Sequence, residues 1–347
     1  YGGIYYSALS KNIGIVQFCG TNRDDCFVAR HLTKANDREH FSSMSKKTNL
    51  YLENKAINQS IVKELEQNFN DRYSQKWILS SRNQPKTINT ERAQARKELG
   101  IKENDIIAII YSHILYDTLF FNGEDLYSSY GKWFVETVKL AKRNPNIKWY
   151  VKIHPSNLWR GEFDDENGLA GKYEEIRLIE ENIGKLPNNI KLIYPDTKYS
   201  PLTWIKVADY GITVRGTSGI ELAAYGKSVI TAGTGRYESI GFTQNPKNIN
   251  EYEELLLSLK KKKELSSLEK EKATKFAYFT FCMKPFNINI VQLLPKIGAR
   301  KSDTNIRSKV YRILEKKLNI RDLKNYIKLV TWLHQKDEID LLNDWPD

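Results

Sequence analysis

The chain has 347 residues, 40% of them hydrophobic and 28% charged, a composition typical of a globular protein long enough for two domains. Lys and Arg outnumber Asp and Glu by 54 to 42, and the formal net charge of +12 favours anionic ligands such as nucleotides, nucleic acid or an acidic membrane surface. The three cysteines are scattered, which argues against a disulfide scaffold and a zinc site, so we expect a cytoplasmic protein with reduced thiols. The lack of an apolar run of about 20 residues argues against a membrane span.

Residues 1–98 are expected to form a first domain whose native start is truncated, because the chain opens at Tyr1 without a signal-peptide pattern. The sequence predicts a strand at 12–18 and helices at 24–32, 57–69 and 91–99. Between them lies a polar stretch that could complete a cleft from this domain, although a surface turn is the stronger explanation: Arg38, Glu39 and His40.

Residues 99–285 show a regular alternation of apolar strands and helical segments. Strands are predicted at 106–111, 148–153, 190–194, 210–214 and 228–232, with helices at 127–142, 172–183, 201–208 and 219–225 between them. This order predicts α/β architecture with a parallel, doubly wound sheet. Further helices are expected at 251–263 and 265–281.

The C-terminal segment, residues 286–347, is expected to be helical over 305–342 and to pack back on the first domain. Basic residues gather at 260–263 and 296–328. A solvated helix face explains these runs, and contact with the anionic inner-membrane surface is the alternative.

The stretch around the predicted helix 219–225 carries the clearest signal for a ligand. A glycine-containing loop that opens a helix directs backbone N–H groups to one place, and the helix dipole makes that place positive. Two such loops follow neighbouring strands here, with cationic and hydroxyl side chains suited to phosphate: Arg215, Gly216, Thr217, Ser218 and Gly219, then Thr234, Gly235 and Arg236. Either Thr217 or Ser218 is expected to cap the helix. The alternative is an ordinary βαβ connection; the spacing fits neither a dinucleotide fingerprint nor an ATPase P-loop.

Titratable residues follow two other predicted strands. Asp117 interrupts an apolar run, which suits a nucleophile or general base but also a buried hydrogen-bonded carboxylate. Lys152 and His154 alternate at a strand end and so face one side, where they could meet an anion, with His154 as phosphate donor or general acid. We call the predicted helix 219–225 the cradle helix, because it and the two glycine loops could hold a phosphate. Glu221 lies one turn into it, where the helix dipole favours a carboxylate, and could also accept hydrogen bonds from ribose hydroxyls.

Taken together, Ser-His-x-x-x-Asp, Val-Lys-Ile-His-Pro-Ser-Asn, Thr-Val-Arg-Gly-Thr-Ser-Gly-Ile-Glu and Thr-Ala-Gly-Thr-Gly-Arg-Tyr resemble motifs of bacterial capsule and lipopolysaccharide glycosyltransferases of the β-Kdo transferase type. The resemblance covers about residues 106–257. It implies the GT-B fold, in which two Rossmann-type domains face a cleft. Ser228 stands where such loops often carry proline.

The resemblance further implies a CMP-activated donor, CMP-Kdo or a related ulosonic acid, and a glycan or lipid-linked acceptor. The acceptor would approach from the first domain, residues 1–98, so this would be the acceptor-side domain and Arg38, Glu39 and His40 would face the acceptor. Lys152, His154 and the 215–219 loop would hold the donor's phosphate and carboxylate, Glu221 would lie near the nucleotide, and Asp117 would be the nucleophile of a retaining reaction. No metal or other cofactor is expected.

Two other functions fit the sequence. A polyol-phosphate or other nucleotide-sugar transferase would share the fold, and donor trials would separate it from a Kdo transferase. A non-catalytic polyanion binder is suggested by the net charge, but no nucleic-acid-binding module is recognisable, so we expect no nucleic acid partner.

Overall fold

The computed structural model describes residues 2–21, 23, 26–74, 87–116, 122–154, 173–261, 263–287 and 320–343. The chain divides into two compact units. Unit 1 comprises Tyr1–Arg82 and Tyr278–Asp347, and unit 2 comprises Asn83–Ala277. The sequence predicts boundaries at 98/99 and 285/286 instead.

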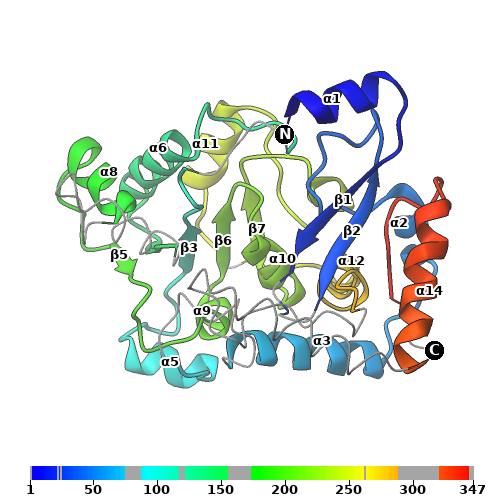
Figure 1. Cartoon of the computed structure of the whole chain (residues 1–347). Coiled ribbons are helices and arrows are strands. Elements are labelled where there is room, and N and C mark those ends of the chain that lie inside the picture. The colour runs from blue at the N-terminus through cyan, green and yellow to red at the C-terminus, as the bar shows by residue number, and fades with distance from the viewer. Residues whose placement is uncertain are drawn as a thin grey trace, which may run out of the picture. The chain divides into compact units, whose positions relative to one another are not determined.

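The described residues of unit 2 form a five-stranded sheet in the order β5-β4-β3-β6-β7 (Figure 1). Its strands are all parallel: β3 (Ile107–Tyr111), β4 (Lys148–Lys152), β5 (Ile190–Ile193), β6 (Tyr210–Thr213) and β7 (Ser228–Thr231). The prediction of α/β architecture with a parallel sheet in the second domain is confirmed.

Helices cover both faces of this sheet, because alternate strand residues are apolar on either side. On one face, Trp133 and Tyr252 pack with Trp149 of β4 in a core built with α6 (Tyr130–Arg143), α8 (Glu174–Asn182) and α11 (Ile249–Leu257). On the other face lie α9 (Pro201–Val207) and α10 (Thr217–Ala224), where Tyr150 meets Trp204 and Gly211 meets Leu222. The carboxyl edge of the sheet is thereby held between two helical layers.

A buried carboxylate explains why α5 (Arg92–Glu98) belongs to unit 2. Asp209, which precedes β6, accepts a 2.6 Å bond from Arg92 Nη2 and a 2.9 Å bond from the N–H of Ile107. These contacts fasten α5 to the amino edge of the sheet, and the domain boundary therefore falls before this helix.

Unit 1 contains an antiparallel strand pair, β1 (Ile15–Gly20) and β2 (Phe27–Leu32), among its described residues. Its helices are α1 (Gly2–Ser10), α2 (Lys46–Glu53), α3 (Gln59–Tyr73), the π-helical turn η3 (Phe279–Met283) and α14 (Ile320–His334), with α12 (Ser267–Tyr278) leading into η3. Among the described residues, the parallel sheet expected of a Rossmann-type domain lies in unit 2, whereas unit 1 has an antiparallel strand pair.

The predicted helix at 24–32 is wrong, because this segment contains β2. The edge of β2 that does not face β1 pairs with residues far along the chain: Phe27 bridges to Phe286, and Arg30 bridges to Asp340. Such distant pairing stabilises a strand that local sequence does not reveal. Of the helical tail expected at 305–342, the described part is α14, and residues 305–319 lie outside the described residues.

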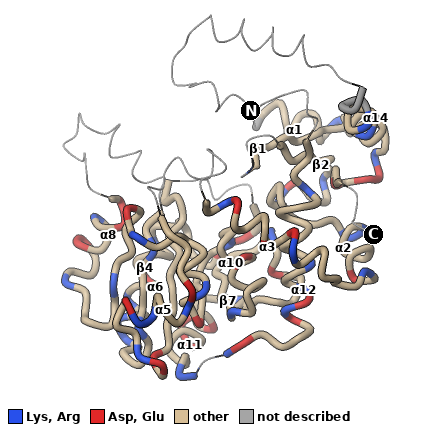
Figure 2. Tube along the Cα trace, turned by 90° about the horizontal axis from the view of Figure 1, so that it is seen from below, with Lys and Arg blue, Asp and Glu red and all other residues tan. Residues whose placement is uncertain are grey.

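No helix among the described residues is long and apolar enough to cross a membrane. Lys and Arg are interspersed with Asp and Glu along α5, α6 and α8 (Figure 2). The predicted helix 251–263 ends early, since α11 stops at Leu257, and the exposed Lys260 and Lys261 follow it outside any helix. Membrane contact stays a prediction.

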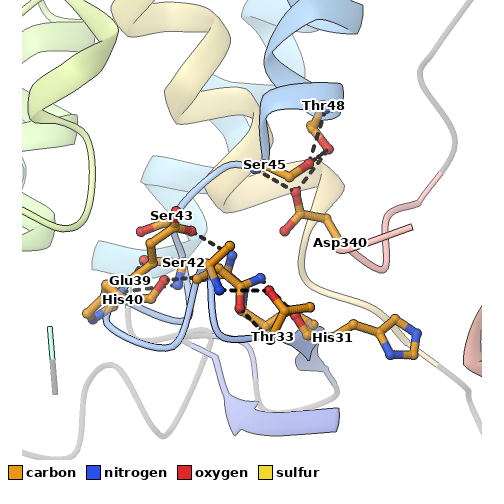
Figure 3. A network of polar contacts seen from close by, with 12 residues as sticks. His31, Thr33, Glu39, His40, Ser42, Ser43, Ser45, Thr48 and Asp340 are labelled. Atoms are coloured by element: carbon orange, nitrogen blue, oxygen red, sulfur yellow. Dashed lines mark hydrogen bonds and ion pairs between the residues drawn. The ribbon is translucent and has the colours of Figure 1, made fainter. Parts of the chain in front are cut away.

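The C-terminal end of unit 1 is fastened by a fully buried ion pair. Lys284 Nζ lies 3.2 Å from Asp340 Oδ1, and both side chains are 0% exposed. The other carboxylate oxygen accepts bonds of 2.9 Å from the N–H of Ser45 and from Thr48 Oγ1 (Figure 3), and Lys284 also donates to the carbonyl of Ser43. Burial alone would raise the pKa of Asp340, but Lys284, Arg30 and these hydrogen bonds together lower it.

Replacing Asp340 with Ala is expected to reduce the free energy of unfolding by about 3–5 kcal/mol, because the Lys284 ammonium then stays buried without its partner. Since the pKa of Asp340 is lowered, its contribution should be present at neutral pH and be lost as pH falls through that pKa. Urea unfolding followed by circular dichroism measures both effects.

The matched control is Glu338→Ala, which removes the exposed ion pair between Glu338 and Lys47 in the same segment. Exposed pairs contribute about 0–1 kcal/mol, so this variant should unfold close to wild type. Equal losses in the two variants would contradict the importance of the buried pair.

Candidate active site at the carboxyl edge of the sheet

Three strand ends of unit 2 meet at one edge of the sheet. Tyr111, the last residue of β3, pairs with Lys152 of β4, and Ile110 pairs with Ile212 of β6. The residues that follow these strands therefore emerge side by side. His154, Arg215 and Arg236 are all close enough to His113 to lower the pKa of its imidazole, after the larger effect of burial. Asp117 lies outside the described residues.

Lys152 is a buried cation that lacks a counterion in the described part of the chain. The residue is only 8% exposed, and its ammonium makes no hydrogen bond or ion pair with a described residue. Burial lowers the pKa of Lys152 from 10.5 to about 8. An ammonium held in this way favours an anion that supplies the missing negative charge.

His154 lies beside Lys152 and is held through the backbone. Burial, together with the charge of Lys152, lowers the pKa of His154 to about 4, so its ring is neutral at pH 7. The backbone N–H of His154 donates to Glu175 Oε1 at 3.1 Å, and the same oxygen accepts a 2.7 Å bond from Ser112 Oγ. Glu175, fully buried in the first turn of α8, thus joins the exits of β3 and β4.

Arg215 is used to hold loops of the protein together. Its guanidinium donates to the carbonyls of Thr234 (2.8 Å) and Glu124 (3.1 Å) and forms a 2.7 Å ion pair with Asp125. The side chain is buried, with a further long contact from Nη1 to the hydroxyl of Tyr130 at 3.4 Å. A direct phosphate contact by Arg215 stays a prediction, and the geometry favours a positioning role.

The two loops that Arg215 joins touch backbone to backbone. A Cβ on Gly123 would lie 2.2 Å from the carbonyl oxygen of Thr234, and one on Gly235 would lie 2.7 Å from the Cα of Gly123. Both glycines also have positive φ angles, +64° and +92°. Thr234 completes the contact, because its N–H donates to the carbonyl of Glu124 at 2.8 Å and its hydroxyl accepts from the N–H of Glu124 at 2.8 Å.

The cradle helix α10 begins two residues earlier than predicted. Gly216 is its N-cap, without a side-chain cap, so the expected capping by Thr217 or Ser218 is wrong. Gly216 N–H donates to Thr213 Oγ1 at 3.1 Å, whereas the N–H groups of Thr217 and Ser218 have no hydrogen bond within the described residues. Two backbone donors at the positive end of the helix are thus available to a ligand.

Other predicted residues of the cradle support this helix start. Arg236 donates to the carbonyl of Arg215 at 3.0 Å and to Thr217 Oγ1 at 3.1 Å. A Cβ on Gly219 would lie 2.3 Å from the hydroxyl of Tyr237, which donates to the carbonyl of Gly216. The side chain of Thr217 and the Cα of Gly219 therefore pack against protein.

Glu221 lies deeper, on the sheet side of α10, with 2% of its surface exposed. Burial and the charge of Glu221 raise the pKa of Tyr111, whose buried hydroxyl has no hydrogen-bond partner among the described residues. Contact of Glu221 with a nucleotide stays a prediction.

The three residues expected to face an acceptor lie in a turn of unit 1. Glu39 is paired with the buried Arg30 at 2.8 Å, and the ring nitrogen Nδ1 of His40 accepts from the N–H of Ser42 at 3.1 Å and lies 2.7 Å from its hydroxyl (Figure 3). Arg38 is exposed. These contacts explain the turn, and acceptor binding stays a prediction.

Sequence reasoning missed His113, Asp125 and Glu175. The position of His113, two residues after a buried strand, could have indicated a functional role. Asp125 and Glu175 could not be found in this way, because their roles depend on contacts between distant segments. Within the described part of the chain, no group of three or more His, Cys, Asp or Glu side chains is arranged to hold a metal ion.

No protein-family model and no curated protein matches the chain. Among solved structures, it is similar to Thermosulfurimonas dismutans KpsC, described as a β-Kdo 2,4-transferase, with 14% identity over 83% of this chain and 78% of that chain and a TM-score of 0.45. A second KpsC structure, the β-Kdo 2,7-transferase, shares 14% identity over 88% and 78% of the two chains, with a TM-score of 0.40. UDP-GlcNAc 2-epimerase from Neisseria meningitidis follows at 15% identity, 54% and 47% coverage and a TM-score of 0.32. At these TM-scores the similarities establish neither family nor activity.

Proposed function

We propose that this chain is a glycosyltransferase that binds a CMP-activated ulosonic acid, with CMP-Kdo as the candidate donor, at the carboxyl edge of the unit 2 sheet. The acceptor is a glycan or a lipid-linked sugar. The observation that carries the proposal is the buried ammonium of Lys152, which has no counterion among the described residues. The motif resemblance supplies the reaction class and the choice of CMP.

The surroundings of Lys152 support an anionic, phosphate-bearing ligand. The N–H groups of Thr217 and Ser218 at the start of α10, which have no hydrogen bond within the described residues, offer further donors near the same edge. A CMP-activated ulosonic acid carries both a phosphate and a carboxylate, so two anionic groups are available for these donors. Fixed donors of this kind stabilise charge as it develops on a leaving phosphate.

In the proposed reaction, the carboxylate of Asp117 attacks the anomeric carbon, and the bond from that carbon to the phosphate oxygen breaks with its electron pair leaving on CMP. The acceptor hydroxyl then attacks the same carbon, gives up its proton to a base, and releases the Asp117 carboxylate. Lys152 and the start of α10 hold the phosphate during the first step. The two inversions give overall retention.

Donor trials test the proposal directly. The purified full chain should bind CMP in a calorimetric titration more tightly than CDP or UDP, and should consume CMP-Kdo in preference to CDP-glycerol or a UDP-sugar. Asp117→Asn should abolish transfer while CMP binding persists, because the substitution removes the nucleophile and leaves the phosphate contacts. Tighter binding of CDP or UDP would assign a different donor, and unchanged turnover of the Asn variant would remove Asp117 from the reaction.

Lys152→Met is expected to weaken CMP binding about 10- to 100-fold, the value of a hydrogen bond to a charged group. The same variant should unfold at a higher denaturant concentration. Its free energy of unfolding at pH 7 should rise by up to about 3 kcal/mol, the cost of keeping the ammonium charged when its pKa falls from 10.5 to about 8. Calorimetry and urea unfolding measure the two effects.

Lys148→Met is the control, because Lys148 lies at the opposite end of β4 and pairs with Asp105 at 2.6 Å. It should leave CMP affinity unchanged. Loss of stability without loss of affinity in Lys152→Met would show that Lys152 serves the fold and would refute its role in binding.

CMP affinity should fall as pH rises through about 8, the pKa of Lys152 in the free protein. The protonated ammonium binds the anion, so affinity is highest below this pH and declines as the group loses its proton. A phosphate monoester is doubly ionised above its second pKa of about 6, and His154, with a pKa of about 4, stays neutral, so neither obscures the trend. Titrations between pH 7 and 9.5 should show the decline in wild type and a flat profile in Lys152→Met.

A further inference from the structure

The ring of His113 is held rigidly at the carboxyl edge. It stacks on Tyr130 with a centroid separation of 4.5 Å and an interplanar angle of 12°, and the edge of Trp133 lies 5.6 Å away. Both aromatic residues come from α6, and the histidine follows β3. A half-buried imidazole fixed on two sides by aromatic rings has little rotational freedom.

The hydrogen bonds to Nε2 determine where the ring carries its proton. The N–H of Val214 lies 3.0 Å from Nε2, and a backbone N–H can only donate, so Nε2 must present a lone pair. Thr213 Oγ1 also lies 3.0 Å from Nε2 and can donate to it. The neutral ring therefore carries its proton on Nδ1.

The ring is neutral throughout the physiological range. Burial, followed by interactions with His154 and with the cationic Arg215 and Arg236, lowers the pKa of His113 to about 3. Within the described residues these are the titratable and charged groups that act on the ring from neighbouring segments, and each disfavours a second proton. His113 therefore offers one N–H donor without adding positive charge.

The other edge of the ring faces the start of α10. A Cβ on Gly216, the N-cap of this helix, would lie 3.5 Å from His113 Cε1, the ring atom bonded to both Nε2 and Nδ1. No described residue accepts a hydrogen bond from Nδ1. Nδ1 is one bond from Cε1 and so lies near the helix start, where the N–H groups of Thr217 and Ser218 have no hydrogen bond within the described residues. The ammonium of Lys152, which lacks a counterion among the same residues, marks this edge of the sheet as an anion site.

We propose that His113 binds the ligand as a neutral donor, directing its Nδ1–H to an anionic oxygen of the phosphate or carboxylate held at the start of α10. This inference rests on the proposed function of the site and adds a specificity residue to it. Val214 locks the tautomer, so the site presents a donor at this point and selects an oxygen that can accept. Residues 213–216 therefore have two roles: they orient the His113 ring and they lead into α10.

Two substitutions separate binding from structure, because each keeps one half of the imidazole. His113→Gln places an amide oxygen near the position of Nε2, where it can accept from Val214, and removes the donor at Nδ1. His113→Asn keeps a donor near Nδ1 and removes the acceptor for Val214 N–H. Calorimetry with CMP on the full chain should show affinity about 10-fold or more weaker for the Gln variant and within about 3-fold of wild type for the Asn variant. Thermal unfolding should show the opposite order, with the Asn variant the less stable.

If His113→Gln binds CMP as tightly as the wild type, the inference about His113 is wrong and the proposed function still stands. A wild type that binds none of CMP, CDP and UDP would overturn both. Nitrogen-15 NMR of histidine-labelled wild type supplies a test independent of the variants. Among the 5 histidines, the resonance missing from His113→Gln should show a protonated Nδ1 and should move on addition of CMP. Protonation at Nε2 would refute the assignment.

Discussion

The ion pair between Arg215 and Asp125 is the contact on which the geometry of the site depends. It is almost fully withdrawn from water, and the same guanidinium reaches two further carbonyls, so one side chain fastens the segments around residues 124 and 234 beside the cradle helix. Breaking a buried pair of this kind leaves a charge without compensation, which makes the arrangement stiff. A consequence is that the arginine's donors are largely spent on protein, so the positive potential felt by a ligand has other sources.

Lys152 is the chief of those sources, and it differs from Arg215 in one respect. The arginine is buried with a partner, whereas the lysine is buried without one in the described residues. The fold therefore carries an electrostatic cost at the carboxyl edge of the sheet, as functional sites often do. Neutral imidazoles beside it avoid a further accumulation of charge, since each added cation would lower the pKa of the lysine and weaken its hold on an anion.

Much of unit 2 could be predicted from the sequence, because its strands are short β-branched runs separated by helical periods, and that order restricts the topology to a parallel sheet. Lys152 and His154 could be placed at the carboxyl edge for the same reason. The partners that decide each side chain's role could not: Asp125 reaches Arg215 across 90 residues, and Val214 reaches His113 across 101. In unit 1 the local pattern misled, since the segment 27–32 becomes a strand only when residues beyond 280 supply its second edge.

The contact between Gly123 and Gly235 limits how this site can vary. Each glycine occupies the space that any side chain on the other would need, and both backbones hold a conformation that L-residues rarely adopt. A crowded pair of larger residues can usually be relieved by trimming one when the other grows. Here neither residue can become smaller, so a change at one glycine cannot be compensated by a change at the other. Variation of the site must therefore come from the residues around these two loops.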